Sequence, residues 1–370
     1  MTPEAKTDIH VLLIAPCVKE RGGREQLSRL ILENLRCVTG DRVEIFHLPF
    51  PQVKASVLER LSGRIDGITA QIEAKLVKRV SQLSPDCIFI EGSNLGRLAR
   101  LLRKTGVTLP IVTFYHNVES HFFFDALRAA PSGHALGVLI ANTIAERWAA
   151  NYSQRRVLLN QRDERLHARL YRRPGTDILP MTVRDQYDPA AAKAARPWDK
   201  PYALFVGGSF YANVEGMAWY AEKVAPHAPL DTVVIGRGMD RHCTRLEKWG
   251  GVNVVGEVDE LARWYAHAQI IIAPILSGSG MKTKTAEALM HGKPIAGTAE
   301  AFEGYNLVAQ DSLICCTTPA DFLEALQGSV SMTAGFNPKL REQYIQHYSE
   351  GSMRETLKNI LENACRNQIP

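Results

Sequence analysis

Short apolar runs alternate with amphipathic stretches through the first half of the chain. Stretches such as residues 24–35 and 67–83 have the apolar spacing of helices that bury one face. The apolar runs between the helical stretches are continuous rather than alternating, as expected for parallel strands covered on both faces. This order of elements predicts a doubly wound α/β sheet. The predicted strands are residues 10–16, 42–48, 86–92, 110–116 and 155–160.

The pattern is interrupted at residues 181–201 and then starts again. The interruption is rich in proline, alanine and charged residues and contains no apolar run, so we expect a linker or a surface excursion there. The chain is therefore predicted to form two α/β domains of similar size with a hinge between them. The strands predicted after the interruption are residues 202–208, 231–238, 251–258, 269–276, 293–298 and 312–318.

Length and composition agree with this organisation. A chain of 370 residues exceeds what one hydrophobic core usually covers, and 45% apolar with 22% charged residues is ordinary for a soluble protein. The net charge of +5 is too small to indicate nucleic-acid binding, but it leaves an anionic substrate or membrane surface open. No stretch reaches the roughly 18 apolar residues of a membrane span, and the first residues do not resemble a signal peptide.

The cysteines indicate a reducing compartment. There are seven of them, an odd number, and none forms a CxxC pair. We therefore expect reduced thiols and a cytoplasmic protein rather than a disulfide framework or a zinc site.

Residues 277–298, SGSGMKTKTAEALMHGKPIAGT, carry the clearest chemical signal. They follow the predicted strand 269–276, so the glycines form a turn at its carboxyl end. A helix is expected to begin near Met281 and to end at Gly292. The free N–H groups of a helix start attract anions, and glycines let a ligand approach the backbone.

Lys282 and Lys284 add two cations to this turn, so the stretch predicts an anion site suited to a diphosphate. The spacing fits neither the Walker A loop nor GxGxxG. A plain strand–helix turn with a surface ion pair between Lys284 and Glu287 is the alternative reading.

Residues 205–226 and 254–304, taken together, resemble the donor domain of the family 4 retaining glycosyltransferases. The resemblance runs through residues 200–330, with several motifs in the family's order. It implies the GT-B fold, an α/β chain in which two Rossmann-like domains face each other across a cleft. The implied domains are an acceptor-binding domain at 1–180, a linker at 181–200, a nucleotide-sugar donor-binding domain at 201–345, and a C-terminal helix within 346–370 that packs back on the first domain.

The resemblance implies roles for individual residues in the donor domain. Glu287 is expected to bind the ribose hydroxyls, because a carboxylate accepts two hydrogen bonds from a vicinal diol. Lys282 and the neighbouring backbone are expected to hold the diphosphate and neutralise it as it leaves. The implied donor-binding residues are Gly22, Gly23, Gly207, Gly208, Ser209, Gly256, Ser279, Gly280, Met281, Lys282, Lys284 and Glu287.

The first half matches the family more loosely. Residues 15–31 resemble its first strand–turn–helix, and FYHNVES at 114–120 resembles its His-Asn-x-Glu stretch beside the reaction centre. The implied catalytic residues are His116, Lys282 and Glu287, and the implied acceptor-binding residues are Asn117 and Glu119. Glu119 also fits a carboxylate that stabilises a helix start.

The sequence departs from the family pattern in two places. Ser279 stands where many members have the first of two glutamates, and the stretch after strand 202–208 lacks their arginine or lysine. We therefore expect Lys282 or Lys284 to meet more of the phosphate charge. The chain also has no Asp-x-Asp motif, so neither a metal nor another cofactor is expected.

Two features of the first half concern the acceptor. Phe122–Phe124 follow the His-Asn-x-Glu stretch; we expect them to pack in the core, and an exposed apolar lip for the acceptor is the alternative. Residues 96–106 and 162–175 are basic and partly amphipathic. That pattern is typical either of solvated helix faces or of a patch for anionic lipid headgroups.

Together these features predict a retaining glycosyltransferase that moves a sugar from a nucleotide-diphosphate donor to a glycan or lipid-linked acceptor. The resemblance implies a setting in bacterial surface or extracellular polysaccharide synthesis. If the basic stretches form a lipid-binding patch, peripheral contact with the inner face of an anionic cytoplasmic membrane is expected. The alternative is a non-catalytic nucleotide- or glycan-binding protein that keeps the fold. A dinucleotide oxidoreductase is disfavoured, because no GxGxxG follows the first strand.

Overall fold

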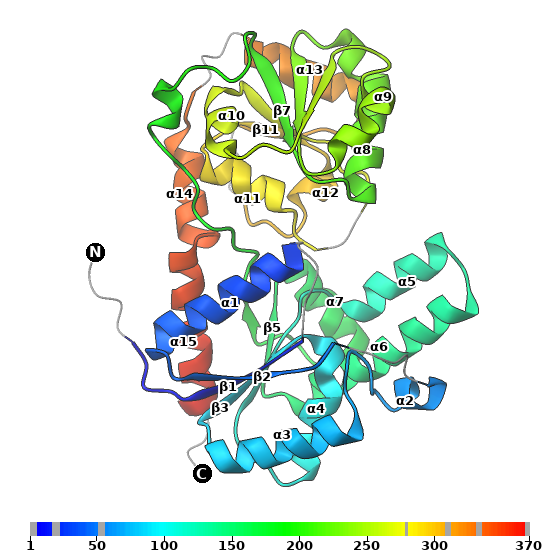
Figure 1. The fold of residues 1–370 in the computed structure, drawn as a ribbon, viewed down its shortest axis with the longest axis vertical. Coiled ribbons are helices and arrows are strands. Elements are labelled where there is room, and N and C mark those ends of the chain that lie inside the picture. The colour runs from blue at the N-terminus through cyan, green and yellow to red at the C-terminus, as the bar shows by residue number, and fades with distance from the viewer. Residues whose placement is uncertain are drawn as a thin grey trace. The chain divides into compact units, whose positions relative to one another are not determined.

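The computed structural model describes residues 6–16, 23–50, 56–277, 280–307, 312–330 and 335–366. The chain divides into two compact units: unit 1 is residues 1–180 with 350–370, and unit 2 is residues 181–349. Each unit contains one parallel sheet of six strands flanked by helices (Figure 1). The predicted α/β fold with two Rossmann-like domains is therefore confirmed.

The sheet of unit 1 has the strand order β2-β1-β3-β4-β5-β6, and all its neighbouring strands are parallel. The inner strands β1, β3 and β4 are buried along their whole length. The bounds are β1 Val11–Ala15, β2 Val43–His47, β3 Cys87–Glu91, β4 Ile111–Phe114, β5 Arg155–Leu158 and β6 Asp177–Ile178.

Two details of this sheet differ from the sequence-based expectation. Strand β2 was expected to be buried, but it is only partly covered because it forms an edge of the sheet. Strand β6 was not predicted, since its two residues are too short to give an apolar run. The other predicted strands of this half are confirmed.

The helices of unit 1 include one from the end of the chain. Helix α15 lies against α1, so residues 350–366 pack on the unit formed by the first 180 residues (Figure 1). The bounds are α1 Gly23–Thr39, α2 Val57–Leu61, α3 Ala70–Leu83, α4 Gly96–Lys104, α5 Glu119–Ala129, α6 Gly133–Tyr152, α7 Gln161–Tyr171 and α15 Glu350–Arg366, with a short 3-10 helix η1 at Ser93–Leu95.

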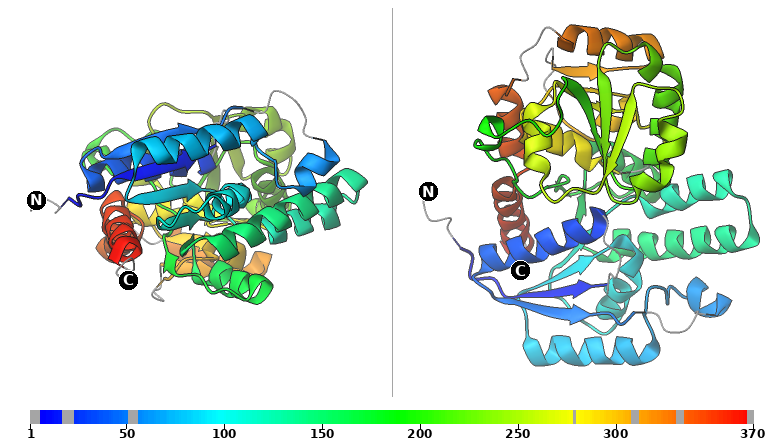
Figure 2. Two further views of the ribbon diagram at one scale, coloured as in Figure 1. Left: turned by 90° about the horizontal axis from the view of Figure 1, so that it is seen from below. Right: turned by 45° about the horizontal axis from the view of Figure 1, so that its top comes forward.

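Helices α5 and α6 pair with each other and extend beyond the sheet of unit 1 (Figure 2). Because α5 projects in this way, Phe122 is 38% and Phe124 is 48% exposed. The expectation that Phe122–Phe124 pack in the core was therefore wrong for these two side chains. Leu136 and Ile140 of α6 are exposed as well, so the hairpin carries apolar surface on both helices.

The two basic stretches of unit 1 differ in how their side chains are engaged. On α4, Arg97 pairs with Glu73 and Arg103 donates to the carbonyl oxygens of Val107 and Leu109. On α7 and the residues after it, four arginines are exposed. These four, called the α7 basic cluster below, are Arg165, Arg169, Arg172 and Arg173.

The sheet of unit 2 has the strand order β12-β11-β10-β7-β8-β9, again with parallel neighbours. All six of its predicted strands are confirmed, and most of their apolar residues lie in one core. The bounds are β7 Tyr202–Val206, β8 Asp231–Ile235, β9 Val252–Gly256, β10 Ile270–Ala273, β11 Ile295–Gly297 and β12 Leu313–Cys315.

The helices of unit 2 are α8 Tyr211–Lys223, α9 Cys243–Leu246, α10 Leu261–His267, α11 Thr283–Met290, α12 Ala299–Phe302, α13 Pro319–Val330 and α14 Pro338–His347. Short 3-10 helices lie at η2 Ala191–Lys193, η3 Ala225–His227 and η4 Met239–His242. Residues 181–201 contain η2 and no strand, and they belong to unit 2. Within the ranges that the structure describes, no helix is both long and apolar enough to cross a membrane.

Candidate donor site and the loop around His116

The carboxyl ends of β7 and β8 meet at a turn that only glycine fits. Gly207 follows β7 and donates its N–H to Ile235 O at the end of β8, 2.8 Å away. A Cβ on Gly236 would lie 2.0 Å from Gly207 O, and a Cβ on Gly207 would lie 2.7 Å from Lys284 Nζ. The two glycines thus let the backbones approach and leave room for a lysine head group.

Lys284 is a buried cation of unit 2. It is 7% exposed, and its Nζ donates to Asn213 Oδ1 at 2.8 Å. The same Nζ lies 5.0 Å from the centre of the Phe205 ring, within the range of a cation–π contact. Burial lowers the pKa of Lys284 to about 8; the nearby Glu287 raises it and Lys282 lowers it. The alternative of a surface pair between Lys284 and Glu287 is wrong, because Lys284 is not at the surface.

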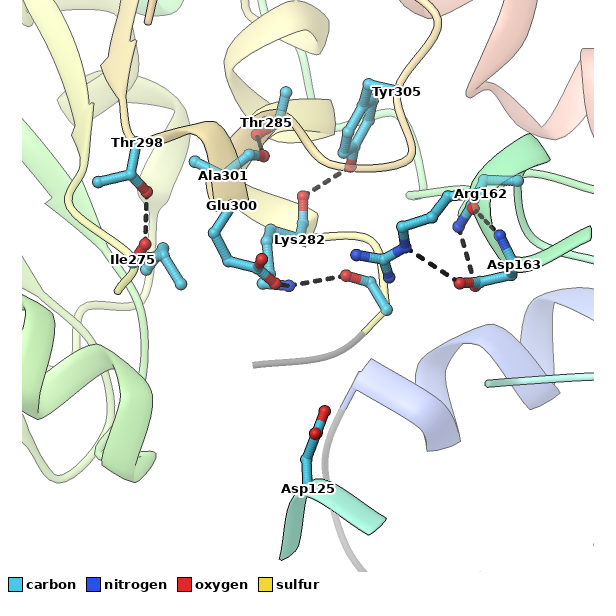
Figure 3. Close-up of polar contacts among 12 residues, drawn as sticks. Asp125, Arg162, Asp163, Ile275, Lys282, Thr285, Thr298, Glu300, Ala301 and Tyr305 are labelled. Atoms are coloured by element: carbon cyan, nitrogen blue, oxygen red, sulfur yellow. Dashed lines mark hydrogen bonds and ion pairs between the residues drawn. The ribbon is translucent and has the colours of Figure 1, made fainter. Parts of the chain in front are cut away.

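Lys282 lies in the turn before α11, and its ammonium already has hydrogen-bond partners within unit 2 (Figure 3). Its Nζ donates to Gly280 O at 2.7 Å and to Glu300 Oε1 at 2.8 Å, and its carbonyl accepts from Tyr305 Oη at 2.6 Å. A phosphate bound here would share the ammonium with a carboxylate.

The turn before α11 is braced from the side of α12. Thr285 Oγ1 donates to Ala301 O at 2.6 Å, and Thr298 Oγ1 donates to Ile275 O (Figure 3). Gly280 has a φ of +70°, which favours glycine at that position. The predicted helix start near Met281 was two residues early: Lys282 has extended backbone, so α11 begins at Thr283.

Glu287 projects from α11 one turn after Lys284. Its Oε2 accepts a hydrogen bond of 2.9 Å from Tyr265 Oη, and the Tyr265 ring stacks on His291. Burial raises the pKa of Glu287, while the Tyr265 hydrogen bond and the Lys284 charge lower it. The tyrosine thereby fixes the direction of the carboxylate.

The remaining predicted donor residues lie near the carboxyl ends of β7 and β9, in the turn before α11 and at the start of α1. Gly208 continues the turn after Gly207, and Ser209 Oγ lies 2.8 Å from His242 Nε2. Gly256 is the last residue of β9 and has a φ of +86°. Met281 is buried, and its Sδ accepts from Met181 N at 3.5 Å. Ser279 and Gly22 lie outside the described residues, and Gly23 is the first residue of α1.

The structure therefore brings Gly207, Lys284 and Glu287 together at the end of the unit 2 sheet where the strands finish. That edge holds the carboxyl ends of the strands, where open α/β sheets bind their ligands. Glycine backbone, a buried ammonium and a carboxylate fixed by a tyrosine could together hold a phosphate and a diol. Their roles as donor ligands stay predictions.

In unit 1, His116 follows the carboxyl end of β4 and is buried. Its Nε2 lies 3.1 Å from Glu91 Oε1 at the end of β3, and Ser28 Oγ donates to the same oxygen. The His116 ring meets Phe114 edge-on, with centroids 4.9 Å apart. The imidazole is thus held on one side by a carboxylate and on the other by an aromatic ring.

The next residues lead into α5. Asn117 is partly exposed, whereas Glu119 is buried and is the first residue of the helix. The backbone N–H of Glu119 donates to Glu146 Oε1 at 2.9 Å. Their predicted acceptor contacts stay predictions.

Glu146, which the sequence analysis did not single out, holds this segment. It projects from α6 and is fully buried, and its carboxylate accepts hydrogen bonds from residues of η1, α5 and α7. The donors are Glu119 N at 2.9 Å, Ser120 N at 3.0 Å, Ser120 Oγ at 2.8 Å, Ser93 Oγ at 3.1 Å and Tyr171 Oη at 2.6 Å. Burial raises the pKa of Glu146, and these hydrogen bonds oppose the rise.

The Glu146 carboxylate replaces a cap on α5. A helix start leaves its first N–H groups without partners, and Val118 at the N-cap makes no side-chain cap bond. Glu146 accepts from the first two of these N–H groups and also binds Ser93, which follows β3. One carboxylate thus fixes the segments that flank His116 and its partner Glu91. A signal existed in the sequence, because Glu146 lies beside the alanine-rich face formed by Ala141, Ala145 and Ala149.

The described residues hold no group of three or more histidine, cysteine, aspartate or glutamate side chains that could bind a metal.

Comparison with known proteins places unit 2 in a family. Residues 200–331 match the family described as glycosyl transferases group 1. The family resemblance drawn from the same stretch of sequence is confirmed for this segment of the chain. None of the curated proteins compared with the chain matches it.

Solved structures share the fold of the whole chain. Sucrose-phosphate synthase from Thermosynechococcus elongatus has a TM-score of 0.69 at 14% identity, covering 97% of this chain and 99% of that one. HepE from Anabaena in complex with UDP has a TM-score of 0.67 at 13% identity, covering 96% and 100%. The apo lipopolysaccharide outer core galactosyltransferase WaaB has a TM-score of 0.59 at 13% identity, covering 97% and 99%. At these identities the similarity shows the fold alone.

The Glu146 network gives a prediction for stability. In Glu146→Gln an amide NH₂ must replace one carboxylate oxygen, so either Glu119 N or Ser120 N loses its acceptor. A buried N–H without a partner costs about 1–3 kcal/mol, so the free energy of unfolding should fall by that amount in chemical denaturation. Tyr171→Phe removes one donor and leaves both N–H groups paired, so it should cost less. Equal stability of Glu146→Gln and the wild type would contradict the role given to this carboxylate.

Proposed function

We propose that this chain is a retaining glycosyltransferase that transfers a sugar from a nucleotide-diphosphate donor to a glycan or lipid-linked acceptor. The observation that carries the proposal is the buried ammonium of Lys284, which lies against Gly207 at the carboxyl edge of the unit 2 sheet. A cation kept out of water attracts an anion more strongly than one at the surface, since solvent screens it less.

The other groups of unit 2 fit the parts of such a donor. Lys282 and the backbone of Gly280 are suited to the diphosphate, and Glu287 is suited to the ribose hydroxyls. The hydrogen bond from Tyr265 holds the Glu287 carboxylate in one orientation, which lowers the entropy cost of binding a diol. Solved structures of HepE in complex with UDP and with UDP-glucose support a nucleotide-sugar as the donor.

We further propose that the transfer needs no metal ion or other cofactor. Lysine ammonium groups meet the charge that grows on the departing diphosphate, and preorganised charges of this kind stabilise a transition state effectively. Lys284 supplies the larger share, because Glu300 already offsets part of the charge of Lys282. Excess EDTA should leave the rate of transfer within a few-fold of that of untreated enzyme.

The acceptor is proposed to bind in unit 1. His116 would contact the transferred sugar or orient the acceptor, with Asn117 and Glu119 beside it. The name of WaaB, an outer core galactosyltransferase of lipopolysaccharide, supports a glycan or lipid-linked acceptor and a bacterial surface polysaccharide as the product. The proposed location is the cytoplasm, with peripheral contact between unit 1 and the inner face of the cytoplasmic membrane.

The first prediction concerns donor binding. Glu287→Ala removes a charged acceptor worth about 1.5–3 kcal/mol, so the Kd for the best-binding nucleoside diphosphate should rise roughly 10- to 100-fold in calorimetric titration. Lys282→Ala should lower turnover more than affinity, because leaving-group charge develops in the transition state.

The control for these variants is Glu222→Ala, which removes an exposed carboxylate of α8 in the same unit. It should bind and turn over as the wild type does. Wild-type behaviour of both Glu287→Ala and Lys282→Ala would move the donor site elsewhere. Tight binding with neither transfer nor slow donor hydrolysis would instead favour a non-catalytic nucleotide-binding protein.

The second prediction concerns pH. In the protein without ligand the pKa of Lys284 is about 8. An anion binds the protonated ammonium more tightly than the neutral amine. Affinity for UDP should therefore be full below pH 8 and fall above it, approaching about tenfold per pH unit as one proton must be taken up on binding. Lys284→Met should bind weakly and without this fall.

Lys293→Met is the matched control. Lys293 is also buried with a pKa of about 8, but it lies before β11 at the opposite edge of the sheet, bound to Ala266 O and Ala268 O. The fall in affinity should persist in this variant. The pH dependence would belong to another group if the affinity for UDP no longer fell above pH 8 in Lys293→Met, or if it still fell in Lys284→Met.

The third prediction concerns the membrane. Each basic side chain near anionic lipid contributes about 1 kcal/mol, so co-sedimentation with anionic vesicles should be strong at low salt and weak at high salt. Replacing the α7 basic cluster by glutamine should abolish it, whereas Arg97→Gln and Arg103→Gln should change it little. Equal and negligible binding of the wild type to anionic and neutral vesicles at low salt would leave a soluble enzyme with a soluble acceptor.

A further inference from the structure

Two cysteines far apart in the sequence lie side by side in unit 1. Cys87 is the first residue of β3 and is fully buried, while Cys365 lies near the end of α15 and is partly exposed. Helix α15 contacts β3, and the Cys365 Sγ lies 3.9 Å from the carbonyl oxygen of Asp86, the residue before Cys87. The two thiols are close enough for each to shift the pKa of the other.

The two thiols are not equivalent. Interaction with the Cys87 thiol lowers the pKa of Cys365, against the opposing effects of burial and of Asp86. The same interaction and burial raise the pKa of Cys87. Cys365 is therefore the thiol that ionises first and that a small molecule can reach, whereas Cys87 can be reached through Cys365. Such a pair has the arrangement of an attacking and a resolving cysteine.

We propose that Cys87 and Cys365 form a reversible disulfide that ties α15 to the sheet of unit 1, with a low-molecular-weight disulfide as the oxidant. The Cys365 thiolate attacks one sulfur of that disulfide, forms a mixed disulfide and releases one small thiolate. Cys87 then loses its proton and attacks the Cys365 sulfur, which releases the second small thiol. The two protein thiols lose two electrons in total, and the small disulfide gains them.

The other described cysteines make the pair distinctive. Cys37 and Cys315 are exposed, and Cys316 is buried with a pKa raised to about 12, mainly by burial. All six described cysteines are free thiols in the structure, so the disulfide would be a modification of the folded protein. It would join the last helix covalently to a strand of the first 180 residues, and a cross-link over so long a loop restricts the unfolded chain.

The experiment uses the full-length, reduced and folded protein with glutathione disulfide as the probe. After quenching by acid, a non-reducing peptide map should contain the Cys87 peptide linked to the Cys365 peptide. The oxidised protein should also melt at a higher temperature, and dithiothreitol should reverse both changes. Cys37→Ser, at an exposed cysteine of α1, is the matched control and should form the same link.

Two variants separate the steps. In Cys87→Ala, or Cys87→Ser if alanine impairs folding, Cys365 should stop at the mixed disulfide with glutathione. In Cys365→Ser, Cys87 should stay reduced, because it is buried. The proposal is wrong if wild-type Cys365 carries glutathione while Cys87 stays reduced in the folded protein, or if both remain free when Cys37 has reacted. None of these outcomes depends on the proposed glycosyl transfer.

Discussion

A buried ammonium constrains the arrangement of unit 2. A charge removed from water must be compensated, and the Lys284 ammonium has one amide oxygen, one aromatic face and a nearby carboxylate. The position of the ammonium leaves no room for a side chain at Gly207, since a Cβ there would lie 2.7 Å from Nζ. It also fixes the start of α11 against the end of β7. The pKa of Lys284 is lowered because these partners do not fully replace water around the ammonium. A bound anion would stabilise the protonated form further.

Unit 1 contains a buried group of the opposite charge that also needs compensation. The Glu146 carboxylate is buried and accepts five hydrogen bonds, two of them from N–H groups at the start of α5. The helix dipole and these donors favour the charged form, whereas burial opposes it. The segment from His116 to Glu119 is thereby fixed at both ends, by β4 and by Glu146. Each unit thus fixes the carboxyl edge of its sheet through one buried charge whose partners come from several elements.

The strands could be predicted because covered parallel strands are continuous apolar runs, and 11 of the 12 were found in this way. The exception, β6, is only two residues long. The order of the strands in each sheet, and hence the partial exposure of the edge strand β2, does not follow from the apolar runs. Phe122 and Phe124 were misjudged for a similar reason, since their exposure depends on how far α5 projects beyond the sheet.

The candidate site could be predicted only as far as local sequence determines it. The glycines and lysines of residues 277–298 indicated an anion site, because a glycine turn before a helix has that property by itself. The burial of Lys284 depends on Gly207 after β7 and on Asn213 of α8, and the Glu146 network joins donors from η1, α5 and α7. Such long-range partners leave little trace in one sequence. The extended backbone at Lys282, which delays α11 by two residues, is equally invisible in its residue type.

Hydrogen–deuterium exchange of the full-length protein, with and without saturating UDP, tests the central claim most directly. If the donor binds at the buried ammonium, exchange should slow in residues 207–213 after β7 and in residues 280–287 around the start of α11, because bound ligand suppresses local opening. The strands of unit 1 should change little. Protection confined to other segments, at a UDP concentration at which titration demonstrates binding, would contradict the account.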